Sequence, residues 1–259
     1  MFDTHAHLDD ERFAGELDAV VQRARRAGVV GILAVGTSAA SSRQTLRLAE
    51  QFEDVFAAVG IQPNSAAEAG PGDWDRIAAL AEHPGVVALG ETGLDRHWDF
   101  TPFDLQQHYF RRHLCLAQDR DLPVVIHCRE AEADLLPMLR EAAGRGPLRG
   151  VLHSFSGDEQ FAAECLGLGL YISFAGQVTY TNRKFEPLRA VARTIPDDRL
   201  LVETDSPYLV PHPLRGREKR NEPSHVLLTA TRLADLRGVS PESLAAQTTA
   251  NARRLFGIE

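Results

Sequence analysis

The chain has 259 residues, of which 44% are hydrophobic and 25% are charged, a balance that is ordinary for a globular protein and excludes a disordered chain. Its formal net charge of −8 argues against binding of nucleic acid through a broad basic face, because that mode neutralises many phosphates with Lys and Arg. The three cysteines, Cys115, Cys128 and Cys165, show no CxxC spacing, which argues against a disulfide framework or a structural zinc site.

The chain opens on the sequence MFDTH, without the basic and apolar regions of a signal peptide. No stretch approaches the ~20 uninterrupted apolar residues of a membrane-spanning helix. We therefore expect a cytoplasmic protein without a membrane partner, and we expect a monomer.

Short β-branched runs alternate with longer helical patterns along the chain, which is typical of βαβ units and a parallel sheet. Eight strands are expected, at residues 2–7, 29–36, 55–62, 86–91, 123–128, 150–155, 170–174 and 200–205. Helices are expected between and after them, for example at residues 10–27, 103–119, 130–143, 224–236 and 241–255. This pattern in a chain of this length predicts a single-domain α/β fold, a (β/α)8 TIM barrel, with a doubly wound open sheet as the alternative.

Residues able to bind a metal stand at the carboxyl ends of these predicted strands. Because the carboxyl ends of all strands of a barrel meet at one mouth, we expect these side chains to lie together. Any one histidine among them is equally consistent with a hydrogen-bonded core residue, but the whole set without a cation would be costly to desolvate. The six residues are His5, His7, Glu91, His127, His153 and Asp205.

Mixed imidazole and carboxylate ligands suit divalent ions such as Zn, Mg or Mn. His5 and His7 are two residues apart on a strand, so both side chains point to one face and can bind the same ion. Glu91 is the candidate bridge between two ions, which at about 3.5–4 Å separation activate a water and stabilise the oxygens of an in-line displacement. Asp205 is the candidate to take the proton from that water. The sequence therefore predicts a two-metal hydrolase in which Asp205 and Glu91 are catalytic.

Other polar residues fall on the same rim. Glu203 precedes Asp205 by two residues and is interpreted as a ligand of a third ion, as a support for the other ligands, or as an interior carboxylate paired with a basic residue. Arg129 is interpreted as a contact to a substrate phosphate or as a partner of a nearby carboxylate. Cys128 points away from its neighbour His127 on a strand, so we expect it to pack in the core.

A long polar loop is expected at residues 207–223, and its segment RGREKRNEP carries most of the positive charge near the predicted mouth. Arginine forks match phosphate oxygens, so Arg220 and Asn221 are candidate contacts to a nucleic acid backbone, although a solvated basic loop has the same composition. Four aromatic residues near this rim are interpreted as stacking on bases or as packing loops: Trp98, Phe100, Tyr180 and Tyr208.

The segments FDTHAHLDD, PVVIHCREA and LLVETDSPYL resemble the signatures of the TatD family of metal-dependent deoxyribonucleases, which belongs among the amidohydrolase-like barrels. GETGLD, VLHSFSG and RGREKRNEP follow the order of the same family, so the resemblance spans nearly the whole chain. It implies a barrel, two or more divalent ions, exonuclease activity on DNA and also RNA, and a part in DNA degradation or repair. It also implies that the six residues at the strand ends are the metal ligands.

The chain departs from this family at two places. Gln62 and Asn64 stand where the family usually has histidines. Amides hydrogen-bond phosphate or water but bind metal poorly and cannot act as general acids, so a third ion and protonation of the leaving group are in question, and Gln62 is expected to contact substrate. The residues RHW follow GLD where the family commonly has two tyrosines, a change expected to alter how the substrate end is held.

Two other functions are consistent with the same residues. One is hydrolysis of a small ester, lactone or amide on an amidohydrolase-type barrel. Such relatives often use a carboxylated lysine as the bridge, whereas this chain has Glu91 and few lysines. The other is an inactive metal- or DNA-binding scaffold, which the amides Gln62 and Asn64 motivate.

Overall fold

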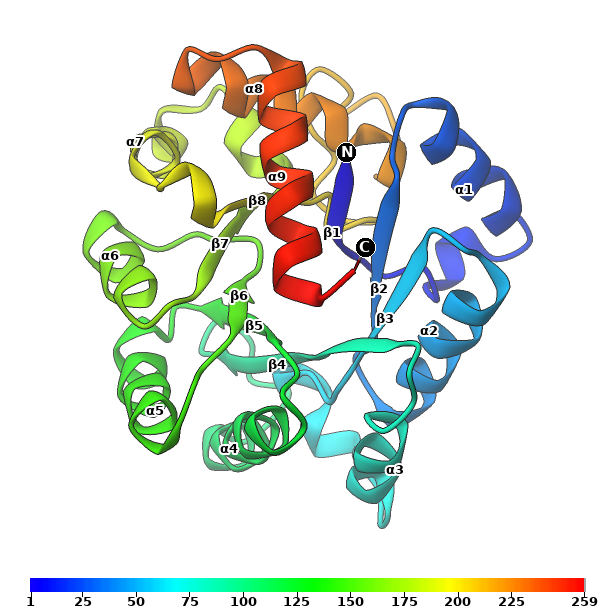
Figure 1. The fold of residues 1–259 in the computed structure, drawn as a ribbon, viewed down its shortest axis with the longest axis vertical. Coiled ribbons are helices and arrows are strands. Elements are labelled where there is room, and N and C mark those ends of the chain that lie inside the picture. The colour runs from blue at the N-terminus through cyan, green and yellow to red at the C-terminus, as the bar shows by residue number, and fades with distance from the viewer. Residues whose placement is uncertain (259) are drawn as a thin grey trace. The chain divides into compact units, whose positions relative to one another are not determined.

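The computed structural model describes residues 1–258, and its eight strands follow one another in the sheet in the same order as in the chain (Figure 1). This order confirms the (β/α)8 fold and excludes the doubly wound alternative, because a doubly wound sheet reverses its strand order at a switch point. The strands are β1 (Phe2–Ala6), β2 (Gly31–Val35), β3 (Val55–Val59), β4 (Val86–Asp95), β5 (Val124–Arg129), β6 (Gly150–Leu152), β7 (Tyr171–Phe174) and β8 (Leu200–Val202).

Helices follow the strands as predicted. They are α1 (Leu17–Arg26), α2 (Ala39–Gln51), α3 (Asp73–Leu80), α4 (Phe103–Arg120), α5 (Glu132–Arg145), α6 (Glu159–Gly167), α7 (Glu186–Thr194), α8 (Val226–Arg237) and α9 (Pro241–Phe256). Short 3₁₀ turns lie between them, namely η1 (Glu11–Phe13), η2 (Pro63–Glu68), η3 (Gly176–Thr179), η4 (Arg183–Phe185), η5 (Asp197–Arg199) and η6 (Pro223–His225).

The first predicted helix, at residues 10–27, is instead η1 followed by α1. Gly15 lies between them with a φ of +75°, in the left-handed region that glycine adopts without strain. The turn at Gly15 therefore separates η1 from α1 and prevents one continuous helix. Among the helices of residues 1–258, none combines the length and the hydropathy that spanning a bilayer would need.

Contacts between residues group the chain into two compact units. The first comprises Met1–Leu33, His153–Ala162 and the chain from Ile172 onward, and the second comprises Ala34–Leu152 and Ala163–Tyr171. We describe each unit by itself, and the single domain expected from the sequence stays a prediction.

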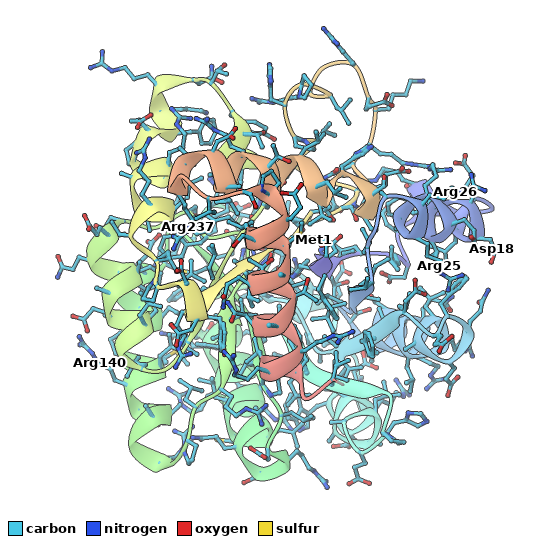
Figure 2. The ribbon with its side chains drawn as sticks, turned by 45° about the horizontal axis from the view of Figure 1, so that its top comes forward. Met1, Asp18, Arg25, Arg26, Arg140 and Arg237 are labelled. Atoms are coloured by element: carbon cyan, nitrogen blue, oxygen red, sulfur yellow. The ribbon has the colours of Figure 1, made fainter. Side chains whose placement is uncertain are left out.

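In the first unit, the start and the end of the sheet lie side by side. Ala6 pairs with Ser206, and the N–H of Asp205 donates to the carbonyl of His5 at 2.9 Å. Helix α9 packs against both β1 and β8 (Figure 1). Met1 lies beside the same helix (Figure 2), where its sulfur is 3.9 Å from the hydroxyl of Thr248. The two ends of the predicted ligand series in the sequence, near residues 5 and 205, are therefore neighbours.

In the second unit, β4 runs four residues further than predicted, to Asp95, and its register against β5 shifts between Leu89 and Thr92. The reason is the close approach of the two strands at Gly93, where a Cβ would lie 2.0 Å from the carbonyl oxygen of His127. Glycine at this position allows Leu94 and Asp95 to continue the pairing. The extended strand places Asp95 beside the end of β5.

Five strands end earlier than predicted, and three of these carry metal-competent residues near their ends. β1 ends at Ala6, β6 at Leu152 and β8 at Val202, so that His7, His153 and Asp205 lie in the segments just beyond. The chain leaves the sheet there through left-handed residues, with a φ of 44° at Ser154 and 54° at Asp205. Residues 207–222 form neither helix nor extended strand before η6 begins at Pro223, as expected for the long loop.

Candidate metal centre

Three ligand atoms of the first unit lie close together at the carboxyl ends of β1 and β8. Nε2 of His5 lies 3.2 Å from Nε2 of His7, and these nitrogens lie 3.8 Å and 3.5 Å from Oδ1 of Asp205. The alternation of side chains along β1 brings both imidazoles to one face, and the backbone bond between Asp205 and His5 fixes the carboxylate opposite them.

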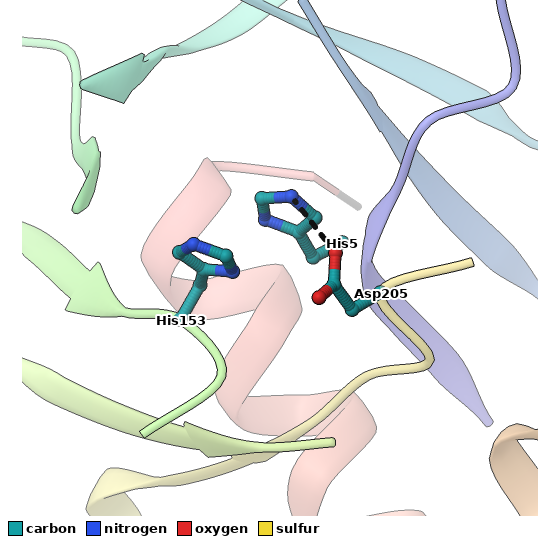
Figure 3. A group of neighbouring side chains, drawn as sticks. All are labelled: His5, His153 and Asp205. Carbon is teal, nitrogen blue, oxygen red and sulfur yellow. Dashed lines mark ion pairs between the residues drawn. The ribbon is translucent and has the colours of Figure 1, made fainter. Parts of the chain in front are cut away.

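His153, just beyond β6, joins the same group (Figure 3). Its ring stacks on that of His5, with 3.9 Å between centroids and 13° between planes. One ligand atom from each of His5, His153 and Asp205 can be chosen so that all three lie within 4.8 Å of one another. The first unit therefore brings together four of the six predicted ligands.

Two buried carboxylates support this group. Oε1 of Glu203 accepts the N–H of Ser154 at 2.7 Å and lies 3.4 Å from Nδ1 of His153. Asp3 accepts the N–H and the hydroxyl of Thr204 at 2.8 and 2.6 Å. Together they fix the backbone on both sides of the ligands. Asp3 was missed at the sequence level, although its spacing of two from His5 places both on the same face of β1.

The electrostatics of the group favour an ionised Asp205. Burial by itself raises the pKa of this carboxyl, but the hydrogen bond from His7 and the charges of His5, His153 and His7 outweigh it, and the pKa lies below its usual value. An ionised carboxylate is the form that binds a cation and accepts a proton.

The donor set fits a divalent metal ion. Imidazole nitrogens and carboxylate oxygens that converge on one point are ligands preferred by zinc and similar ions. Oε2 of Glu203 is buried and has no hydrogen-bond partner within residues 1–258. A buried carboxylate oxygen without a donor is costly unless a cation neutralises it.

The second unit forms its own cluster at the ends of β4 and β5. Nδ1 of His127 lies 2.8 Å from Oε1 of Glu91, and Nε2 of the same ring lies 3.0 Å from Oδ2 of Asp95. The imidazole is thus held between two carboxylates that lie four residues apart on β4. This arrangement is typical of a metal-binding histidine, whose second nitrogen is oriented by a carboxylate.

The amides of this unit contact the same carboxylates. Nε2 of Gln62 donates to Oε1 of Glu91 at 3.2 Å, and Nδ2 of Asn64 donates to Oδ2 of Asp95 at 3.0 Å. Gln62 and Asn64 therefore hold the acidic residues from one side. A contact of Gln62 with substrate stays a prediction.

Asp95 is a second residue that sequence reasoning missed. Burial alone raises its pKa, but hydrogen bonds from His127, from Asn64 and from the N–H of Trp98 outweigh burial and bring the pKa well below its usual range. Its position at the carboxyl end of a strand, four residues after Glu91, was the available signal. It was hidden because the strand was expected to end at Glu91.

The predicted substrate contacts have the following surroundings. Arg129 is the last residue of β5, and its guanidinium lies 5.6 Å from the ring centroid of Trp98. Arg220 donates to the carbonyl of Arg12 and pairs with Glu16 at 2.5 Å. The buried Asn221 donates to the carbonyl of Thr204 at 2.9 Å. Asn221 thus holds the long loop near Asp205, and the contacts of these residues with substrate stay predictions.

The remaining candidates differ in exposure. Tyr180 is buried under Arg215, whose guanidinium lies 3.8 Å from its ring centroid, so it packs a loop. Tyr208 is 47% exposed, with Arg12 over its ring at 4.2 Å. Burial raises the pKa of the Cys128 thiol, which agrees with a packing residue.

The fold and these clusters of imidazole and carboxylate side chains define a metal-dependent hydrolase. The chain belongs to the TatD-related DNase family, whose model matches residues 2–257. This match confirms the family expected from the sequence motifs.

Individual relatives cover the chain from end to end. It is 42% identical over 258 residues to the uncharacterized metal-dependent hydrolase YabD of Bacillus subtilis, covering 100% of this chain and 99% of that one. It is 40% identical over 260 residues to the 3'-5' ssDNA/RNA exonuclease TatD of Citrobacter rodentium, covering 100% and 98%. The crystal structure of YjjV, a TatD homologue from Escherichia coli, superposes with a TM-score of 0.92 at 32% identity, covering 100% and 98%.

Proposed function

We propose that this protein is a metal-dependent 3'-5' exonuclease that removes nucleotides from single-stranded DNA and RNA. The observation that carries the proposal is the convergence of His5, His7 and Asp205 at the carboxyl ends of β1 and β8. It occurs in a chain that aligns from end to end with relatives named 3'-5' ssDNA/RNA exonuclease.

The proposed metal ligands are the six residues expected from the sequence. When bound, two divalent ions, Zn, Mg or Mn, would supply Lewis acidity at the phosphate and lower the pKa of the attacking water. The support is that each unit by itself groups its share of the ligands, His5, His7, His153 and Asp205 in one and Glu91 and His127 in the other.

The protein's own side chains accept the proton and orient the metal ligands. Asp205 accepts a proton from the water that attacks phosphorus, while the bond from phosphorus to the leaving oxygen breaks. Glu203 and Asp95 act as positioning residues, because they orient His153 and His127. Gln62 and Asn64 have no acidic proton to give, so the leaving oxygen takes its proton from solvent.

The test is incubation of metal-reconstituted protein with end-labelled single- and double-stranded DNA and RNA, beside Asp205→Asn. We expect mononucleotides to be released from the 3' end of single strands, a chelator to abolish release, and the substitution to slow it by roughly 10²–10⁴-fold. Inert nucleic acid at full metal occupancy would contradict the proposal. In that case a small-ester assay decides between the amidohydrolase-type alternative and the inactive scaffold. Action as a monomer, a cytoplasmic location and a role in DNA repair stay predictions.

A further inference from the structure

Two aromatic side chains after β4 are exposed and stacked on each other. Trp98 is 44% exposed and Phe100 is 61% exposed. Their ring centroids lie 5.3 Å apart with 9° between the planes. Within residues 1–258, large hydrophobic side chains with comparable exposure are few, and the others are Val30, Tyr208 and Val239. A parallel pair of rings in solvent is therefore an unusual feature of this surface.

The loop that carries these rings is tied to the candidate metal centre. Oδ1 of Asp95 accepts the N–H of His97 at 2.8 Å and the N–H of Trp98 at 3.0 Å. The other oxygen of the same carboxylate lies 3.0 Å from Nε2 of His127. One side chain thus fixes both a predicted metal ligand and the start of the aromatic segment.

Polar contacts hold this loop, and the ring of Trp98 also meets that of His97 edge-on, with 4.7 Å between centroids. Arg96 pairs with Asp134 at 2.7 Å, and Nδ1 of His97 lies 2.8 Å from Oε1 of Glu130. These bonds attach the segment to the end of β5 and to α5. Because polar contacts already anchor the loop, packing of the loop does not account for the exposed faces of Trp98 and Phe100.

The chemistry of this surface suits an unpaired nucleobase. Every base has a π-face, so stacking on aromatic rings holds single strands of any sequence, whereas bases inside a duplex are already stacked. The guanidinium of Arg129, near Trp98, adds a positive charge that a phosphate can contact. The net charge of −8 argues against gripping a strand through a broad basic face, whereas stacking on aromatic rings supplies affinity that does not depend on net charge.

We infer that Trp98 and Phe100 form a stacking platform for the bases of a single strand whose end lies in the metal centre. The inference rests on the proposed nuclease function and deepens it. It assigns the selection of single strands to base stacking rather than to contacts with the backbone.

The test compares two oligonucleotides with the same backbone, one bearing thymine bases and one abasic throughout. Binding is measured by fluorescence anisotropy in the metal-loaded full-length protein carrying Asp205→Asn to suppress turnover. We expect Trp98→Ala with Phe100→Ala to weaken binding of the thymine strand on the order of tenfold or more. Binding of the abasic strand should not change, and Trp98→Phe should keep most of the affinity because it keeps a ring.

Two controls keep the result specific. Val239→Ala removes another exposed apolar side chain and should leave both affinities unchanged. The chain has two tryptophans, so Trp74→Phe leaves Trp98 as the sole indole. Its fluorescence should be quenched by the thymine strand and not by the abasic one.

Equal losses on both strands, or no loss on either, would overturn the platform. This failure is distinct from failure of the proposed function. A platform that fails leaves metal-dependent cleavage of single strands intact in the protein that retains Asp205, whereas failure of the function abolishes cleavage of every nucleic acid.

Discussion

Asp95 and His127 lie on neighbouring strands, and Oδ2 of Asp95 is 3.0 Å from Nε2 of the imidazole. The other imidazole nitrogen faces Glu91. The carboxylate of Asp95 thus sets the direction in which His127 can offer a nitrogen to a metal.

Asp95→Asn tests this relationship. The amide keeps the size of the side chain but loses the charge that orients the imidazole. We expect metal affinity to fall by roughly 10–100-fold, the usual effect of losing a carboxylate behind a metal-binding histidine. Isothermal titration with zinc measures it, with Asp134→Asn as a control that removes the α5 carboxylate paired with Arg96. Unchanged affinity would show that Asp95 only supports the loop.

Asp205→Asn tests the proposed proton acceptor. Loss of a general base lowers kcat by roughly 10²–10⁴-fold. We expect a fall of this size in single-turnover cleavage of labelled DNA. Metal content, measured by elemental analysis, must be determined alongside, because Asp205 is also a proposed ligand. Wild-type turnover in the variant would exclude Asp205 as the base.

Gln62→His combined with Asn64→His tests the role of the amides. Each amide now donates to an acidic residue of the site, and a histidine can in addition supply a proton. We expect the double variant to cleave DNA faster than the wild type below pH ~6.5, where an ordinary histidine is protonated. The measurement is the rate of DNA cleavage by the double variant divided by that of the wild type, followed across pH. A ratio that is constant across pH would show that leaving-group protonation does not limit the rate.

Stability should depend on pH through His113, which is fully buried in α4. Burial lowers its pKa to about 4 from 6.5, and its Nε2 accepts the N–H of Ile61 at 3.1 Å. Because the folded pKa lies below the unfolded one, the stabilisation is fully present above pH 6.5 and is lost as pH falls toward 4. This one group should lower the unfolding free energy by about 1.4 kcal/mol per pH unit in that window. Urea unfolding of wild type and His113→Gln gives the difference, and parallel pH curves would contradict it.

Gly93→Ala should damage both fold and site. Its φ of +142° strains any other residue, and a Cβ would lie 2.0 Å from the carbonyl oxygen of His127. We expect a loss of at least about 2 kcal/mol in unfolding free energy together with reduced metal binding. The matched control is Gly144→Ala in α5, where a Cβ meets nothing within 4 Å. That change should be neutral or stabilise the helix, and equal effects of the two substitutions would refute the steric explanation.

The sequence predicted the strand order because short, largely apolar runs alternate with helical patterns, and it predicted the residues at several strand ends because those runs close on His, Glu or Asp. It did not predict that β4 continues to Asp95, since this depends on the approach of Gly93 to the backbone of β5, a contact between distant segments. It also missed Asp3, whose importance appears only when Thr204 lies beside it. Proposed metal ligands can be recognised from their residue type, whereas positioning residues such as Asp3 and Asp95 are recognised only once the structure shows which side chains they contact.

The bond between Asp205 and His5 joins residues two hundred positions apart. During synthesis, β1 therefore cannot form its contact with Asp205 until nearly the whole chain has left the ribosome. Prematurely terminated products that stop before Asp205 lack both this neighbour and a proposed ligand. Hydrolytic competence should thus arise late in biogenesis, and fragments released by interrupted translation should be harmless to cellular nucleic acids.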